Sequence, residues 1–398
     1  MSCDRAQLYF HAWTRAHAWI PWLLTPLGFA ACAYAARRWF PNSQGSGIPQ
    51  AIVAAGAGDP EIRRELVSLR VAAGKLLLTV AGLTFGASTG REGPTVQLGA
   101  SILHFAGRFA PRLRGGLIVA GGAAGIAAAF NAPLAGIMFG IEEMSRKFEG
   151  HAIRLMIAAV IAAGLTARAL LGDYTYFGTA TGAIAAREWL DVLVCGLAGG
   201  LAGGLFSRMV VGISTSSWRK RLDLAGHRRA VPLALLCGVG VALCGLLSGG
   251  LIHGTGYSEV RSALDGHSSL PASYFVLKLF ATLLSTVSGI PGGIFSPSLA
   301  TGAGLGADVA VLLGSTHVAL VMTIGMVAYL AGVVQAPLTA FIIVTEMTDD
   351  RQMLIPLMSA ALLAHGVSRL VCPEGIYHLL ARSLRERLRG ESASTRDS

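Results

Sequence analysis

Three Gly/Pro-rich strings interrupt apolar segments of the chain: GSGIP (45–49), GREGP (90–94) and GGIFSP (292–297). Each precedes an apolar stretch, so each can leave backbone N–H groups unpaired at a helix N-terminus, which carries about half a positive charge. Such an end binds an anion without a full Lys or Arg charge, and partial charges allow both entry and release. A single break can be only a packing kink, but three breaks favour an anion site.

Carboxylates also stand in apolar surroundings. Glu92 lies inside the second break, and Glu142 and Glu143 lie in the string IEEM. Ionisable residues at membrane depth are costly and are functional by default. The alternative for Glu142 and Glu143 is a hydrated helix end near Arg146 and Lys147. Both descriptions can hold for a residue that takes up protons from water.

An intramembrane hydrolase is the competing class of function. It would need a nucleophile with a base in reach. Ser88 and Ser296 lie near breaks, but no His or Lys stands in a matching segment. We therefore do not expect an enzyme. The six cysteines include no CxxC pair or metal-ligand spacing, so neither a metal nor a cofactor is expected.

The breaks belong to an internal repeat. Equivalent positions in the two halves are occupied by Lys75 and Lys278, Glu92 and Phe295, Pro94 and Pro297, Pro133 and Pro337, and Glu142 and Glu346. We read one transmembrane domain, 1–398, made of a first repeat (1–186, short at its N-terminus) and a second (187–398). Transporters built this way bind substrate at the repeat interface. We expect inverted repeats, although the residues alone also fit parallel ones.

The composition sets the elements that must position these residues. The 398 residues are 53% hydrophobic and 14% charged, where a soluble domain has about a quarter charged residues. Several apolar runs approach the roughly 20 residues that span a bilayer. The 51 glycines suit close helix packing in lipid. The predicted fold class is an all-α integral membrane protein, a polytopic helical bundle with broken helices.

The net charge of +10 comes from basic residues clustered in short loops. The positive-inside rule explains them better than nucleic-acid binding does. It predicts that the loop 219–229 and the C-terminus are cytoplasmic. Lys75 and Lys278 occupy equivalent repeat positions, and we expect them to bind backbone carbonyls or a carboxylate instead of substrate.

The three motifs in this order, with a tyrosine near the C-terminus, resemble the signature of the CLC family of chloride channels and proton-coupled chloride transporters. The resemblance runs from about residue 19 to residue 389. It implies chloride transport, with no cofactor. It also implies a homodimer in the inner (plasma) membrane, multi-pass, with chloride, protons and the lipid bilayer as partners.

The resemblance also implies site residues. Ser46 and Tyr377 offer hydroxyls to a central anion, and the backbone amides of Ile294 and Phe295 bind it as well. Gly45, Gly47 and Gly93 belong to the same motifs and are expected beside the anion. Ser46 matches chloride-selecting members.

Glu92 is implied as the gate, because its carboxylate can occupy an anion site when charged and withdraw when protonated. Glu143 is implied as the inner proton acceptor, with Glu142 beside it on the proton pathway. Since channel members often carry an apolar residue at the inner position, we expect chloride/proton antiport. The alternative is a passive voltage- or pH-gated chloride channel.

Members of this family usually carry two more helices upstream. The sequence therefore predicts either a misassigned start codon or a truncated member.

Overall fold

The computed structural model describes residues 2–17, 19–145, 150–172, 176–178, 188–215 and 227–394, and these are helical and connected by loops. The helices of the first half are α1 (Ser2–Ala16), α2 (Ile20–Arg38), α3 (Ile48–Gly56), α4 (Pro60–Leu66), α5 (Leu69–Thr84), α6 (Glu92–Ala106), α7 (Arg114–Phe130), α8 (Pro133–Phe139), a π-helical turn (Gly140–Met144) and α9 (Gly150–Leu171). Short 3-10 turns at Gly107–Phe109 and Pro111–Leu113 join α6 to α7.

The helices of the second half are α10 (Trp189–Thr215), α12 (His227–Leu247), α13 (Tyr257–Leu264), α14 (Tyr274–Val287), α15 (Phe295–Leu313), α16 (Val318–Val334), α17 (Pro337–Thr348), α18 (Leu354–Val371) and α19 (Ile376–Ser394). Among the described residues, seven helical segments are long and apolar enough to cross a membrane. The predicted all-helical, polytopic fold class is confirmed.

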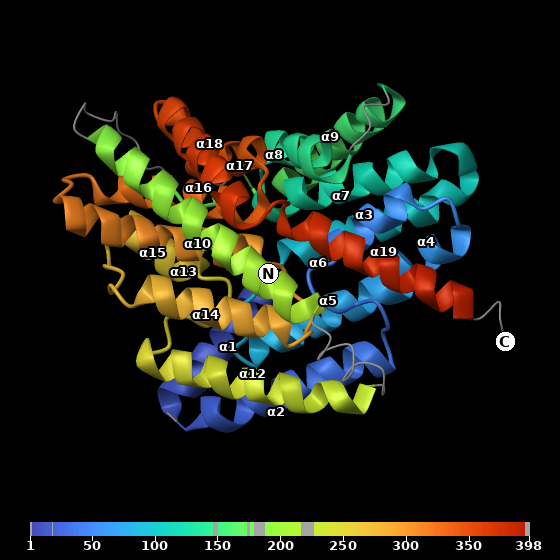
Figure 1. The fold of residues 1–398 in the computed structure, drawn as a ribbon, viewed down its shortest axis with the longest axis horizontal. Coiled ribbons are helices and arrows are strands. Elements are labelled where there is room, and N and C mark those ends of the chain that lie inside the picture. The colour runs from blue at the N-terminus through green and yellow to red at the C-terminus, as the bar shows by residue number, and fades with distance from the viewer. Residues whose placement is uncertain are drawn as a thin grey trace.

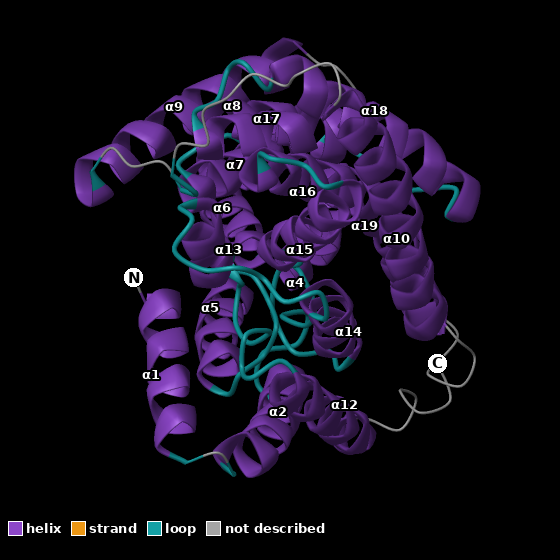
Figure 2. Cartoon of the chain, turned by 90° about the vertical axis from the view of Figure 1, so that its left-hand side faces the viewer, coloured by secondary structure: helices purple, strands orange, loops and turns teal. Residues whose placement is uncertain are grey.

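The helices differ in how much of their surface is covered. Side chains of α16 are buried on all sides from Leu320 to Val334, as expected for a helix that is apolar all round. By contrast, α9 and α18 have much less of their apolar surface inside the protein. In both views α8, α9, α17 and α18 lie along one face, and α2 and α12 lie side by side at the opposite end (Figures 1 and 2).

In each half of the chain, glycines allow two neighbouring helices to approach closely, and the two helix pairs correspond to each other. A side chain at Gly99 on α6 would overlap the carbonyl of Gly121 on α7, and one at Gly302 on α15 would overlap the carbonyl of Gly325 on α16. Small residues permit this backbone contact, and van der Waals packing then holds the helices together in lipid. The α6–α7 and α15–α16 pairs are therefore built alike.

The buried lysines also match. Lys75 donates from Nζ to the Gly45 carbonyl at 2.8 Å, and Lys278 donates to the carbonyls of Ile252 and Gly254 at 2.8 and 2.9 Å. These carbonyls belong to irregular loops and have no partner within a helix. At membrane depth such backbone groups must be hydrogen-bonded inside the protein, and the lysine side chains provide those bonds. The prediction that these lysines bind backbone carbonyls is confirmed.

Two glutamates at matched repeat positions bind helix ends reciprocally. Glu142 accepts hydrogen bonds from the first turn of α17, including the Thr339 amide at 2.7 Å. Glu346, at the end of α17, accepts from the first turn of α8, including the Ala135 amide at 2.7 Å. Carboxylates stabilise helix N-termini in this way, so each half caps a helix of the other.

Some predictions concern residues outside the described part. The repeat boundary at residues 186 and 187 lies there, as do Arg146, Lys147 and residues 219–226 of the predicted cytoplasmic loop. The division into two repeats and their inverted arrangement stay predictions, with the matched glycine, lysine and glutamate contacts in their favour.

Candidate ion-binding site

The three Gly/Pro-rich breaks meet in the interior. Gly90 and Gly293 exchange backbone hydrogen bonds, both of 2.7 Å, and the Gly292 amide donates to the Gly45 carbonyl at 3.0 Å. Hydrogen bonds between loops that lie more than about 200 residues apart in the sequence therefore fix the third break relative to the first two. Figure 2 shows loops crossing the interior among the helices.

Each break leads into a helix, as the motifs predicted. Helices α3, α6 and α15 begin at Ile48, Glu92 and Phe295. Gly47, just before α3, has φ of 98°, a left-handed conformation that glycine adopts without steric cost. Because the breaks are joined, the N-termini of these helices, with their unpaired amides, are gathered in one region.

The carboxylate of Glu92 occupies the N-terminus of α15. It accepts hydrogen bonds from the Ser296 amide at 3.4 Å and from the Ser296 hydroxyl, and the side chain is fully buried. A side chain at Gly90 would overlap this carboxylate, and one at Gly293 would contact it at 3.0 Å. The two glycines thus form a slot that holds a negative charge at an electropositive helix end.

Two unpaired hydroxyls lie next to that slot. Ser46 and Tyr377 are both buried, and their hydroxyl oxygens have no hydrogen-bond partner within the described residues. The Tyr377 hydroxyl lies beside that of Ser46, outside the geometry of a normal hydrogen bond. A side chain at Gly93 would overlap the Ser46 hydroxyl and carbonyl oxygens. Buried hydroxyls normally have partners, so this pair is suited to a ligand.

Aromatic rings form one wall of the region. The ring of Phe295 stacks on Tyr377 with centroids 5.8 Å apart and an interplanar angle of 11°, and it packs against Phe130 and Phe139. Ile294 is buried beside it. These contacts hold the first turns of α15 and α19 together, so Glu92, Ser46, Phe295 and Tyr377 converge on one place although the sequence separates them widely.

The adjacent glutamates in IEEM point in different directions. Both oxygens of Glu142 are bound to the first turn of α17. Glu143 is 2% exposed and its Oε1 lies 3.6 Å from Nε2 of His378 on α19. Glu142 therefore acts as a helix cap, and its place on a proton pathway stays a prediction.

Arg91, the neighbour of Glu92, turns away from the slot. Its guanidinium donates to both oxygens of Asp4 on α1, at 3.1 and 3.0 Å, and lies over the ring of Tyr176. Its exposed fraction is 19%. The charge of Arg91 is thus committed to α1 and does not supply the slot with a fixed cation.

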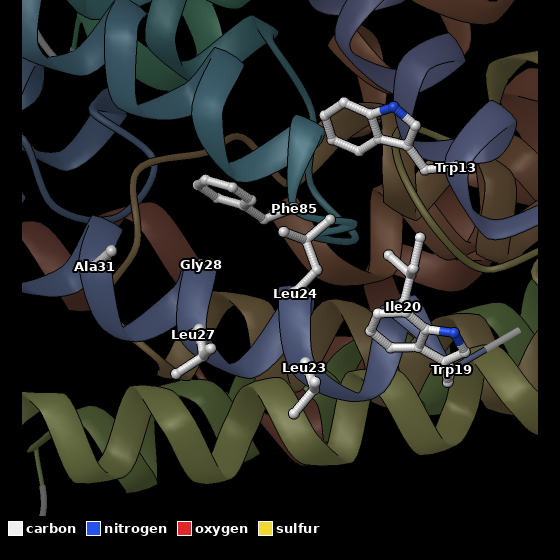
Figure 3. Close-up of a pocket in the computed structure, with 9 residues that line it drawn as sticks. All are labelled: Trp13, Trp19, Ile20, Leu23, Leu24, Leu27, Gly28, Ala31 and Phe85. Atoms are coloured by element: carbon white, nitrogen blue, oxygen red, sulfur yellow. The ribbon is translucent and has the colours of Figure 1, made fainter. Parts of the chain in front are cut away.

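An apolar cavity of about 500 Å³ lies away from this region. Its lining comes from Trp13 of α1, from α2 with Trp19 just before it, and from Phe85, which follows α5 (Figure 3). Its lining contains no charged side chain. An inorganic ion would gain nothing there, so the cavity is not part of the candidate site.

Sequence reasoning missed two residues that contact predicted ones. Ser296 was considered only as a nucleophile, but its hydroxyl donates to Glu92. Its position inside the GGIFSP motif could have indicated that it belongs with the other motif residues. His378 was not considered, although it directly follows Tyr377. The other serine considered as a nucleophile, Ser88, has its hydroxyl 3.0 Å from that of Thr282.

Known proteins share this sequence and fold. A family model described as the voltage gated chloride channel matches residues 28–369. The H(+)/Cl(-) exchange transporter ClcA of Cronobacter sakazakii is 33% identical, with 94% of this chain and 85% of the relative aligned. The transporter of the same name from Salmonella arizonae is 34% identical, with 92% and 80% aligned.

Solved structures agree. A slow cyanobacterial Cl-/H+ antiporter superposes with a TM-score of 0.81 at 27% identity, covering 96% of this chain and 92% of that chain. A CLC-type fluoride/proton antiporter superposes with a TM-score of 0.77 at 25% identity, covering 95% and 92%. The similarity therefore extends over the whole helical domain that carries the site.

Proposed function

Because this chain belongs to the voltage gated chloride channel family and is a multi-pass membrane protein, we propose that it exchanges chloride for protons. The observation that carries the proposal is the Glu92 carboxylate, bound at the N-terminus of α15 where an anion would bind. A side chain that occupies an anion site and can also take up a proton couples the two ions by competition. The relatives named above, which are described as exchangers and antiporters, support the same reading.

Chloride would bind next to the slot. The hydroxyls of Ser46 and Tyr377 would donate to it, as would amides at Ile294 and Phe295 at the N-terminus of α15. None of these donors carries a full charge, which keeps binding weak enough for release. Gly45, Gly47 and Gly93 would provide the space that the anion needs.

Glu92 would then act as the gate. Deprotonated, its carboxylate competes with chloride for the helix end; protonated, it loses the charge that the helix dipole stabilises by up to about 2 kcal/mol. Protonation therefore favours withdrawal of the side chain and entry of an anion. Glu143 would supply protons to this cycle from the other side of the anion site.

The decisive test is simultaneous recording of chloride and protons with the purified chain in proteoliposomes. Under an outward chloride gradient and no proton gradient, we expect chloride efflux to be accompanied by proton uptake against the resulting voltage. Collapse of the uptake when chloride is replaced by an impermeant anion would be the control. Chloride efflux with no proton uptake would instead identify a passive channel.

We further propose a homodimer in the inner (plasma) membrane with a cytoplasmic C-terminus. The face formed by α8, α9, α17 and α18 (Figures 1 and 2) supports the dimer. On this face, α9 and α18 leave leucines such as Leu165, Leu170 and Leu370 exposed. Basic residues on α19, among them Arg385, favour the cytoplasmic side by the positive-inside rule.

Exchanging Leu170 for lysine should weaken this dimer, since a charge would be buried between apolar faces. We expect a shift from dimer to monomer in the mass measured by light scattering in detergent. Leu247→Lys, on exposed α12 at the opposite end, is the matched control and should stay dimeric. Equal masses for all three proteins would contradict this assignment of the interface.

A further inference from the structure

A histidine lies against the buried glutamate that the proposed cycle uses as its inner proton acceptor. Nε2 of His378 is 3.6 Å from Oε1 of Glu143. The carboxylate is 2% exposed, whereas the imidazole is 16% exposed. Water therefore has more access to the ring than to the carboxylate, so the ring offers a proton a path between water and Glu143.

The position of His378 in the fold connects it with the anion site. It stands in the first turn of α19, where its amide donates to the Gly375 carbonyl at 3.1 Å. The preceding residue, Tyr377, is the buried tyrosine that stacks on Phe295. One helical turn thus contacts the proposed chloride site with one side chain and the proposed proton acceptor with the next.

The neighbouring glutamate, Glu142, has different partners. Glu142 has both oxygens bound to the first turn of α17 by donors that do not titrate in the physiological range. Glu143 instead faces an imidazole, whose ordinary pKa is close to neutral pH and which accepts and donates protons at its two ring nitrogens. The contact distance is within reach of direct transfer after a small side-chain movement, or of transfer through one water.

We propose that His378 is a relay residue that carries protons between water on the cytoplasmic side and Glu143, an inference that rests on the proposed antiport. When the proton moves from water toward Glu143, the protonated His378 ring gives the proton on Nε2 to Oε1 of Glu143. This leaves a neutral imidazole and a carboxylic acid. The ring then takes a new proton from water. The same steps in reverse remove the proton from Glu143 and release it to water.

Arg382 and Glu386, further along α19, are paired with each other. Nε of Arg382, one turn beyond His378, lies 3.4 Å from Oε1 of Glu386, and both side chains are exposed. They stay in water on the outer surface of the helix. His378 differs from them in that it is only partly exposed and contacts Glu143.

The first test replaces His378 by glutamine, which keeps a polar side chain of similar size but cannot relay a proton. In the coupled flux assay we expect proton transport to fall about a hundredfold, the lower end of the range for loss of a proton-transfer group. The matched control is His317→Gln, because His317 also contacts a carboxylate, Glu188, at 2.6 Å, but its side chain is 58% exposed and stands at the N-cap of α16. It should keep wild-type proton transport.

A second measurement separates a relay from a structural role. In a Glu92→Gln background, where chloride movement no longer depends on protons, adding His378→Gln should leave chloride flux unchanged. A structural role beside Tyr377 would lower chloride flux there as well. Adding imidazole buffer to the cytoplasmic side should restore proton transport to His378→Ala.

The outcomes distinguish the two levels of inference. If the wild-type chain moves no protons, the proposed antiport itself is wrong. If the wild-type chain couples the two ions and His378→Gln does so at the same rate, antiport stands and the relay is wrong. An equal loss of chloride flux in the Glu92→Gln background would also overturn the relay, by assigning His378 to the support of the chloride site.

Discussion

Replacing Glu92 with glutamine is expected to abolish proton transport and to leave chloride flux in place. The amide has nearly the shape of the carboxylate but neither charge nor a titrating proton. It therefore cannot compete as an anion for the N-terminus of α15, where Ser296 now binds the carboxylate. Proton uptake should fall to the level of protein-free liposomes, while chloride efflux stays within a few-fold of wild type.

The control is Glu61→Gln, which removes an exposed carboxylate on α4. It should transport both ions as the wild type does. Wild-type proton uptake by Glu92→Gln would show that protons cross without this side chain, and the competition mechanism would then be wrong. Loss of both fluxes together would also contradict it, because the slot should admit chloride when no carboxylate competes.

Gly93→Ala is expected to have the second large effect, a loss of chloride binding and transport. The added methyl group would overlap the hydroxyl and carbonyl oxygens of Ser46. Overpacking of this kind costs about 1–3 kcal/mol, and the strain falls on the hydroxyl proposed to hold the anion. We expect at least about a tenfold loss of chloride affinity by calorimetric titration, and a comparable fall in flux.

Gly366→Ala is the matched control, because a methyl group at that helical glycine meets no atom within 4 Å. It should bind chloride normally. Ser46→Ala provides a variant without overlap: it removes one proposed donor and should weaken binding while the protein elutes and melts as the wild type does. Unchanged affinity in a folded Gly93→Ala protein, or in Ser46→Ala, would place the anion elsewhere.

Local patterns were sufficient to predict the class of fold. The low charge, the apolar runs and the glycine content led to a polytopic helical protein, and the structure has one. The repeat led to equivalent roles for Lys75 and Lys278, and both bind loop carbonyls. Such features depend on side-chain type and on spacing along the chain, which the sequence contains directly.

Partners across long distances were beyond these patterns. Glu142 is hydrogen-bonded to the first turn of α17, and the sequence separations of its partners are 196 and 197 positions. No residue near Glu142 in the sequence predicts these partners. The same holds for Ser296, which reaches Glu92 across 204 positions. Motif recognition grouped the candidate residues, but it did not say which hydroxyls are bound and which are left without a partner.

The sequence by itself thus determined where helices break and which residue types stand at the breaks, since Gly, Pro and apolar spacing act locally on the backbone. Only the tertiary structure decided that the breaks are hydrogen-bonded to one another, that Glu92 fills the end of α15, and that His378 faces Glu143. The physical reason is that helix ends expose amides whatever their surroundings, whereas the packing of all helices determines which side chain those amides meet.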